Sequence, residues 1–129
     1  MRKLNAILLI DDDAVTNYLN QILLEELQVA KEIAICTNGE KALKYLLTVC
    51  KSNQSPELIL LDLNMPVLDG FGFLEKYKQA HLNEVCKSTI AVLSSSSNPR
   101  DQEKVKQTGL AQYLIKPLSA EQLKALLGE

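Results

Sequence analysis

The fold is decided by one stretch of the sequence, Glu57-Leu58-Ile59-Leu60-Leu61-Asp62-Leu63-Asn64-Met65-Pro66-Val67-Leu68-Asp69-Gly70. Its apolar run, Leu58–Leu61, is too short for a membrane span and predicts a strand buried on both faces. Turn residues follow at Asn64, Pro66 and Gly70, so the strand cannot continue through them. We expect it to end on Asp62, at the edge of the sheet where open α/β folds bind their ligands.

A second acidic strand end lies earlier in the chain. The apolar segment Asn5–Ile10 predicts a buried strand, and Asp11-Asp12-Asp13 follow it directly. Taken alone, Asp62 would be interpreted as the cap of the next turn. The two acidic strand ends together favour a shared site, because the carboxyl ends of parallel strands lie along one edge of a sheet.

Strands and helices alternate along the chain. Further strands are expected at Glu32–Cys36, Thr89–Leu93 and Gln112–Ile115. Apolar spacing predicts a helix from Val15 to Leu27, and a second over Glu40–Val49 after the cap Asn38. After Gly70, a third helix carries Phe71, Leu74 and Tyr77. A fourth begins at Asn98-Pro99 and stops at Gly109, with Val105 as its main anchor, and a last one follows Ser119 with Gln122 at the capping-box position. The alternation predicts one α/β domain over residues 1–129, with a parallel five-stranded sheet and helices on both faces. It does not reveal the strand order.

Charge and hydropathy exclude two classes of function. The net charge is −2 and the basic residues are spread along the chain, so the Lys/Arg stripe needed for non-specific nucleic-acid binding is absent from the sequence. No apolar run approaches the length of a membrane span, and the Met-Arg-Lys start leads into a short strand rather than a signal peptide. We therefore expect no nucleic-acid and no membrane partner.

The three cysteines, Cys36, Cys50 and Cys86, are odd in number and lack metal-type spacing. They are interpreted as packing thiols in a reducing cytoplasm rather than as a disulfide framework.

Functional residue types recur at the predicted strand ends. Asp11 and Asp12 follow the first strand, Asp62 the third, Ser94 the fourth and Lys116 the fifth. Crowded carboxylates repel one another unless a positive charge lies among them, and Mg²⁺ with oxygen ligands supplies that charge. A lysine and a hydroxyl can bind phosphoryl oxygens, so the set predicts phosphoryl transfer.

Each of these residues also has a simpler interpretation. Asp13 is expected to cap the first helix, Lys116 could be a solvated loop residue, and Ser94 an ordinary turn residue. Tyr113 would then be a half-buried packing aromatic, and His81 a surface residue away from the acidic edge. The joint pattern favours function, because four separate strand ends carry matching chemistry.

The sequence resembles the response-regulator receiver domains of two-component signalling. The resemblance rests on the strand ending in Asp11-Asp12, on Asp62-Leu-Asn-Met-Pro66 with Asp69-Gly70, on the hydroxyl at Ser94, where threonine is commoner in the family, and on Tyr113-Leu-Ile-Lys116-Pro117. The resemblance covers nearly the whole chain. Within the family, the sequence is similar to the chemotaxis-regulator type.

The resemblance implies a flavodoxin-like sheet with strand order 2-1-3-4-5 and Asp62 as the phospho-acceptor. It implies that Asp12, Asp62 and the Asn64 main-chain carbonyl hold Mg²⁺ (or Mn²⁺), with Asp11 helping through water. Lys116 would contact the phosphoryl group, and its bond to Pro117 would be cis. Ser94 and Tyr113 match the pair that rearranges on phosphorylation.

The resemblance also implies partners. A sensor histidine kinase or a histidine phosphotransfer protein would supply the phosphoryl group in the cytoplasm. The output surface would be the face formed by the Asn98–Thr108 helix, the fifth strand and the last helix, which could bind a downstream protein or a second copy in a homodimer. The protein would be a signalling domain that assists its own phosphorylation and dephosphorylation, rather than an enzyme. We expect either a stand-alone receiver or a piece of a longer regulator.

Two alternatives are less consistent with the sequence. Ile10 and Asp11–Val15 also fit the first sequence motif of haloacid-dehalogenase-type phosphohydrolases. Ser94 and Lys116 follow in the right order for the next two motifs of that family. That family needs an acidic pair on a strand after the lysine, whereas only Glu121 and Glu129 follow here. A receiver-like scaffold that is not phosphorylated would typically lack the acceptor, the acidic pair or the lysine, and all of these are present.

Overall fold

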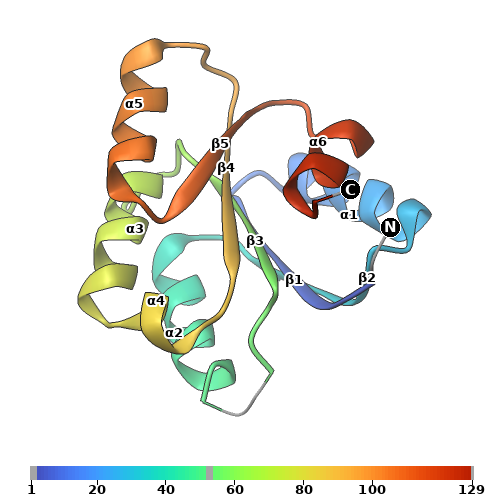
Figure 1. The fold of residues 1–129 in the computed structure, drawn as a ribbon, viewed down its shortest axis with the longest axis horizontal. Coiled ribbons are helices and arrows are strands. Elements are labelled where there is room, and N and C mark those ends of the chain that lie inside the picture. Colours follow the sequence, from blue (N-terminus) through green and yellow to red (C-terminus); the bar gives the residue numbers. More distant parts are fainter. Residues whose placement is uncertain (1–2, 52–53, 129) are drawn as a thin grey trace.

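One parallel sheet of five strands forms the centre of the structure, a computed structural model that describes residues 3–51 and 54–128 (Figure 1). The strands are β1 (Leu4–Ile10), β2 (Ala30–Cys36), β3 (Leu58–Asp62), β4 (Thr89–Ser94) and β5 (Ala111–Ile115). Their spatial order is β2-β1-β3-β4-β5, and every neighbouring pair is parallel. The doubly wound, flavodoxin-like α/β fold and its strand order are therefore confirmed.

Helices cover both faces of the sheet. In the described part of the chain they are α1 (Ala14–Leu27), α2 (Gly39–Val49), α3 (Gly70–Gln79), α4 (Leu82–Val85), α5 (Pro99–Thr108) and α6 (Ala120–Leu126). Helices α1 and α6 lie on one face, and α2, α3 and α5 on the other (Figure 1). The short helix α4 was not predicted. No helix among the described residues combines the length and the apolar character that crossing a bilayer requires.

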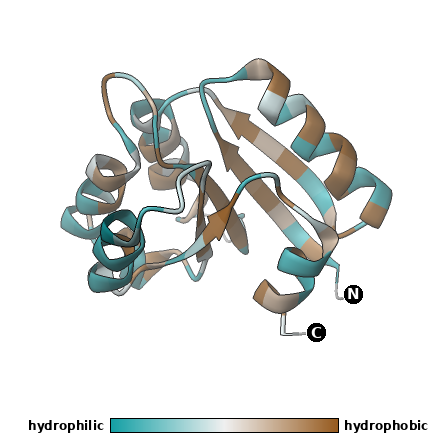
Figure 2. Cartoon of the chain, turned by 90° about the horizontal axis from the view of Figure 1, so that it is seen from above, coloured by the Kyte–Doolittle hydropathy of each residue, from teal (hydrophilic) through white to brown (hydrophobic). Residues whose placement is uncertain are grey.

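Strand β3 is buried along its whole length, as its apolar run predicts. Successive side chains of a strand point to opposite faces, so Leu58 and Leu60 pack with α1 and α6, whereas Ile59 and Leu61 pack with α2 and α3. Hydrophobic residues accordingly run along the central strands in Figure 2. Because helices cover both faces of β3, its last residue, Asp62, lies at the end of a strand whose every residue is buried.

The helix boundaries confirm the predicted caps. Asn38 begins α2, Asn98 followed by Pro99 begins α5, and Gly109 ends α5 in the left-handed conformation with a φ of 68°. Ser119 begins α6 and forms the predicted capping box with Gln122. These helix ends could be predicted from the sequence because each capping residue forms hydrogen bonds with free backbone groups of the helix next to it.

Helix α1 forms where predicted, but its apolar residues do not all face the core. Val15 and Leu19 are 64% and 58% exposed, and the neighbouring Tyr18 is 63% exposed. Asn17 and Leu24 are the buried residues of this helix. The outer half of α1 therefore presents an apolar surface to solvent.

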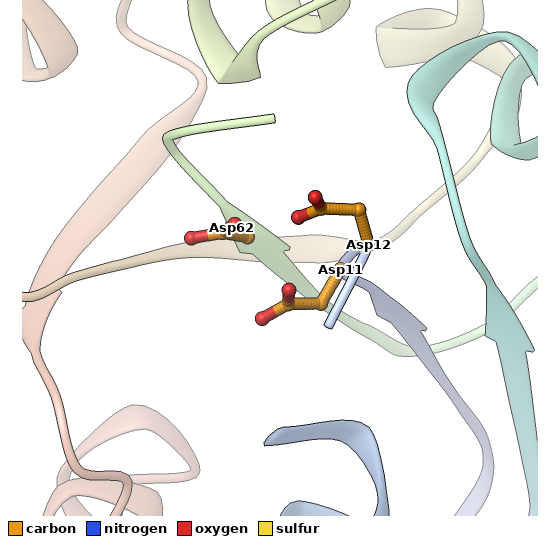
Figure 3. Close-up of side chains that lie close together, drawn as sticks. All are labelled: Asp11, Asp12 and Asp62. Carbon is orange, nitrogen blue, oxygen red and sulfur yellow. The ribbon is translucent and has the colours of Figure 1, made fainter. Parts of the chain in front are cut away.

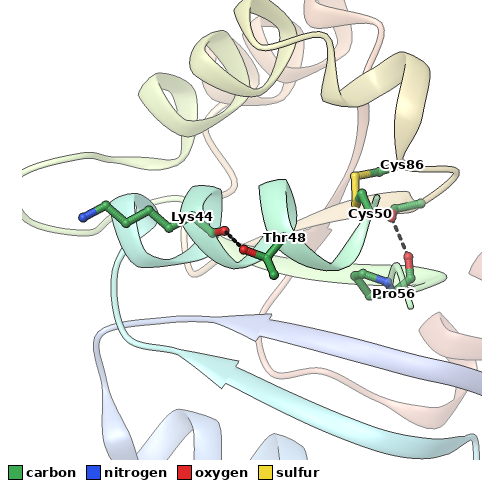
Figure 4. The surroundings of a disulfide bond; sticks show 6 residues. Lys44, Thr48, Cys50, Pro56 and Cys86 are labelled. Atoms are coloured by element: carbon green, nitrogen blue, oxygen red, sulfur yellow. Dashed lines mark hydrogen bonds between the residues drawn. A yellow bond between two sulfur atoms is a disulfide. The ribbon is translucent and has the colours of Figure 1, made fainter. Parts of the chain in front are cut away.

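The interpretation of all three cysteines as packing thiols was wrong. Cys50, at the end of α2, and Cys86, directly after α4, form a disulfide whose Cα atoms lie 5.3 Å apart (Figure 4). Cys36 is the only free cysteine among the described residues. The pairing was not visible in the sequence because the two residues are 36 positions apart and are brought together only by the packing of α2 and α4 on the same face of the sheet. Both lie near the amino-terminal edge of the sheet, away from the acidic strand ends.

Candidate functional site: an acidic cluster at the carboxyl edge of the sheet

Asp11, Asp12 and Asp62 come together at the carboxyl edge of the sheet, as predicted (Figure 3). Asp62 is the last residue of β3, and Asp11 and Asp12 directly follow the neighbouring strand β1. One carboxylate oxygen from each lies within 4.8 Å of the others. Asp11 and Asp62 are buried and Asp12 is exposed, so the cluster opens to solvent on one side.

Lys116 joins this cluster from the end of β5. Its Nζ lies 3.1 Å from Asp62 Oδ1 and 3.5 Å from Asp11 Oδ2. Burial alone would lower the pKa of Lys116, but the hydrogen bond to Asp62 and the negative charges of Asp11 and Asp62 outweigh it, so the pKa is raised. The ammonium group is therefore held in its charged form. The Lys116-Pro117 peptide bond is cis, as the resemblance implied.

The Asp11 carboxylate is buried and interacts with three neighbouring groups. Burial raises its pKa, and the charge of Asp62 acts in the same direction, whereas the hydrogen bond from the Asp13 backbone and the charge of Lys116 oppose them. Its Oδ1 accepts the Asp13 backbone N–H at 2.9 Å. A second positive charge, in addition to that of Lys116, would further reduce the cost of keeping Asp11 ionised.

Asp13 caps α1, as predicted. Its carboxylate accepts the Val15 N–H at 3.2 Å and the Thr16 hydroxyl at 2.6 Å. The Thr16 bond and the Val15 N–H lower the pKa of Asp13. Three consecutive aspartates thus divide into two cluster members and one helix cap.

Asn64 lies exposed in the loop after β3, two residues beyond Asp62. The loop is held by Leu68, whose side chain packs so closely against Gly39 of α2 and Gly72 of α3 that a Cβ atom at either glycine would lie within 3 Å of it. Asn64 is therefore presented at the same edge as the acidic cluster by a loop fixed to two helices.

Ser94, the last residue of β4, and Tyr113 of β5 both form hydrogen bonds with Ser96 in the loop after β4. Ser94 is fully buried, and its Oγ accepts the Ser96 N–H at 3.0 Å. The Tyr113 hydroxyl donates to the Ser96 carbonyl at 2.6 Å. Ser96 therefore connects the two residues, a link that the sequence did not reveal. His81 begins α4 at an exposed position beside Glu84 and is not part of the site, as expected.

Sequence reasoning missed one residue beneath the cluster. Asn17 of α1 is only 4% exposed, and its Nδ2 donates to the Asp11 main-chain carbonyl at 2.9 Å. A polar residue at a buried helix position was the available signal, but apolar spacing assigned no role to it.

The arrangement fits a divalent cation and a phosphoryl group. Carboxylate oxygens are ligands that Mg²⁺ prefers, and the exposed Asp12 leaves one side of the cluster accessible to solvent. Lys116 provides a fixed positive charge beside the Asp62 oxygen. Carboxylates around a cation, with a lysine beside them, are groups that can position a transferred phosphoryl group and offset its charge.

Comparisons with known proteins agree with this chemistry. A family model described as "Response regulator receiver domain" matches residues 7–128. The probable C4-dicarboxylate response regulator DctR of Halalkalibacterium halodurans is 27% identical over 121 residues, which cover 94% of this chain and 49% of that protein. The probable methanogenesis regulatory protein FilR2 of Methanothrix harundinacea is 32% identical over 124 residues, covering 95% of this chain and 79% of that protein. The chain spans about half the length of the DctR relatives.

Solved structures show the same likeness. A two-component response regulator from Cytophaga hutchinsonii superposes with a TM-score of 0.91 at 34% identity, covering 98% of this chain and 96% of that chain. The receiver domain of the histidine kinase CKI1 from Arabidopsis thaliana, complexed with Mg²⁺ and BeF₃⁻, superposes with a TM-score of 0.79 at 18% identity, covering 97% of this chain and 91% of that chain. The second comparison concerns the fold alone.

Proposed function

This chain belongs to the response regulator receiver domain family of two-component phosphorelay signalling, and from that premise we propose that Asp62 accepts a phosphoryl group from a histidine kinase or a histidine phosphotransfer protein. The observation that carries the proposal is the contact of 3.1 Å between Lys116 Nζ and Asp62 Oδ1 within a cluster of three carboxylates. We assign this role to one domain spanning residues 1–129, acting in the cytoplasm.

In the proposed reaction, Asp62 is the nucleophile. Its Oδ1 is paired with Lys116, so we assign the attack to its other oxygen. The bond from that oxygen to phosphorus forms as the bond between phosphorus and the donor's imidazole nitrogen breaks, and the leaving imidazole nitrogen takes up a proton from solvent. Positioning and charge account for most of the catalysis in such transfers.

Asp11, Asp12, Asp62 and the Asn64 main-chain carbonyl would hold Mg²⁺ or Mn²⁺. The cation, when bound, supplies positive charge that offsets the charge of the phosphoryl oxygens. Lys116 contacts one phosphoryl oxygen, and its raised pKa keeps it charged for this purpose. The chain thereby assists its own phosphorylation and dephosphorylation while remaining a signalling protein.

Ser94 and Tyr113 form the proposed switch. A hydroxyl donates more strongly to a charged phosphoryl oxygen than to a neutral acceptor, so the phosphorylated Asp62 draws Ser94 toward it. Because Ser94 and Tyr113 both bond to Ser96, movement of Ser94 shifts this loop and the tyrosine ring with it. The surface of α5, β5 and α6 then changes shape and binds a downstream protein or a second copy.

The exposed apolar side of α1 is the proposed docking surface for the phosphodonor. Val15, Tyr18 and Leu19 are each more than half exposed. A cleft of about 290 Å³ between α1 and the Lys116-Pro117 segment continues this surface toward the lysine of the site. A donor protein whose phosphohistidine must reach Asp62 can bury these side chains at the same time, which favours its binding here.

The deciding experiment is phosphorylation by a small donor. With acetyl phosphate and Mg²⁺, the wild-type chain should take up one phosphoryl group on Asp62, mapped by mass spectrometry after borohydride trapping. Asp62→Asn should remain unlabelled. Labelling that persists in that variant, or that maps to Asp11, would contradict the proposal and favour the phosphohydrolase interpretation.

A further inference from the structure

Asn17 occupies an unusual position in α1. It lies four residues beyond the cap Asp13, donates its own backbone N–H to the Asp13 carbonyl at 3.1 Å, and turns its side chain into the protein, where only 4% of it is exposed. Leu24, the other buried residue of this helix, is apolar. An amide side chain at such a position requires an explanation, because burying its oxygen and its nitrogen costs free energy unless both atoms form hydrogen bonds.

The amide is only half satisfied. Nδ2 donates to the Asp11 carbonyl at 2.9 Å, whereas Oδ1 is buried with no hydrogen-bond partner among the described residues. Leucine has nearly the same shape and would leave no polar atom unpaired on this side chain. The fold therefore tolerates an unfavourable group at this position, and the Asp11 carbonyl is the only described group that benefits.

That carbonyl belongs to the peptide unit joining Asp11 to Asp12. The plane of a peptide unit is rigid, so a bond to its oxygen also restrains the residue on its other side. Asp11 is further held through its backbone N–H, which donates to the Cys36 carbonyl at 3.2 Å, and through its Oδ1, which accepts the Asp13 N–H at 2.9 Å. Asp12 is exposed and depends on this peptide plane for its direction toward the cluster.

We propose that Asn17 is a positioning residue for the divalent-cation site: by fixing the Asp11–Asp12 peptide plane it aims both carboxylates at Asp62. The inference rests on the proposed function only in taking this cluster as the cation site. Supporting hydrogen bonds of this kind, one step removed from a metal ligand, typically change metal affinity by about tenfold or more.

The test is Mg²⁺ binding by isothermal titration calorimetry. Asn17→Leu should weaken Mg²⁺ binding about tenfold, while its melting temperature in EDTA stays within a few degrees of the wild type. Gln21→Leu is the matched control, since it replaces a side-chain amide by leucine one turn further along the same helix, and it should leave Mg²⁺ affinity unchanged. Asn17→Ala removes the same bond without adding bulk, and it serves if the leucine variant does not fold.

A second measurement needs no cation. In the Mg²⁺-free protein, Asn17→Leu should broaden the backbone NMR signals of Asp12 and Asp13 through conformational exchange on the microsecond-to-millisecond timescale, with those of α2 and α3 unchanged. A merely structural role predicts a lower melting temperature with wild-type Mg²⁺ affinity in the folded variant, and that result would overturn the inference. The phosphorylation of Asp62 is tested separately with acetyl phosphate, so failure of one proposal is distinguishable from failure of the other.

Discussion

Asp11 and Asp13 are two residues apart, yet the structure places them in opposite electrostatic environments. Asp11 is buried beside Asp62, and burial raises its pKa. Asp13 is exposed, and the hydrogen bonds from Thr16 and Val15 lower its pKa. Two carboxylates in one short segment therefore affect the pH dependence of stability with opposite signs.

We expect this difference to be measurable in the absence of divalent cations. Because the folded-state pKa of Asp11 lies above 3.8, the native state holds this proton longer than the unfolded state as the pH rises, so ionisation of Asp11 removes stability up to its folded-state pKa. Asp11→Asn should accordingly gain stability relative to the wild type between acidic and neutral pH. Urea unfolding at several pH values measures this gain.

Asp13→Asn is the matched comparison, and we expect its stability relative to the wild type to fall, rather than rise, as the pH increases from acidic to neutral. The folded-state pKa of Asp13 lies below 3.8, so its contribution to stability is present above that value and is lost as the pH falls through the folded-state pKa. Asparagine keeps the helix cap but not the charge. A gain in relative stability toward neutral pH in this variant as well would show that the two environments are not distinct.

On the proposed output face, α5 is anchored in the core by a single buried residue. Val105 is its buried residue, and the rest of its surface is largely polar. Lys104 lies over the ring of Phe71 in α3, 4.1 Å from the ring centroid, which gives a second contact of modest strength. A helix held by so few contacts can adopt two packings of similar free energy, as a switch requires.

Ser94→Ala should therefore separate phosphorylation from its output. We expect Asp62 in this variant still to accept phosphate from acetyl phosphate, because Ser94 is not the nucleophile. The changes that beryllofluoride produces in the NMR signals of Tyr113 and α5 should be largely lost, since no hydroxyl remains at this position to bond the phosphoryl mimic. Wild-type shift changes in the variant would mean that the signal leaves the site by another route.

Elements whose signals are local could be predicted from the sequence, and those that depend on tertiary contacts could not. The caps at Asn38, Asn98 and Ser119 and the acidic strand ends lie next to the elements they define. Helix α4 is too short for apolar spacing to reveal it. The hydrogen bond of Asn17 could not be predicted because its acceptor is the backbone carbonyl of Asp11, six residues earlier. Every residue has a backbone carbonyl, so residue types do not indicate which one is bonded.

At the scale of the whole molecule, the Cys50–Cys86 disulfide stabilises the fold from the side opposite the site. It closes a loop across 36 positions of sequence, which in the chain-entropy model corresponds to about 4 kcal/mol, and measured values are often smaller. Cys50 and Cys86 lie near the amino-terminal ends of the strands, whereas the acidic cluster lies at their carboxyl ends. Stability and phosphorylation should therefore respond separately to loss of the disulfide.

The double variant Cys50→Ala/Cys86→Ala should lose about 2–4 kcal/mol of unfolding free energy in urea titrations. Its labelling at Asp62 by acetyl phosphate should remain close to that of the wild type. Cys36→Ala is the control for loss of a cysteine side chain outside the disulfide. Equal unfolding free energies for the oxidised and reduced wild-type protein would contradict the expected stabilisation.

The same disulfide makes residues 50–86 a covalent ring, and Asp62, its loop and α3 lie inside that ring. A protease that cuts one peptide bond between Cys50 and Cys86 opens the ring without dividing the molecule, so both fragments stay joined until a reductant is added. A cut anywhere outside the ring releases a fragment at once in denaturant. Comparing nicked samples on reducing and non-reducing gels thus assigns each cleavage site to the ring or to the chain outside it.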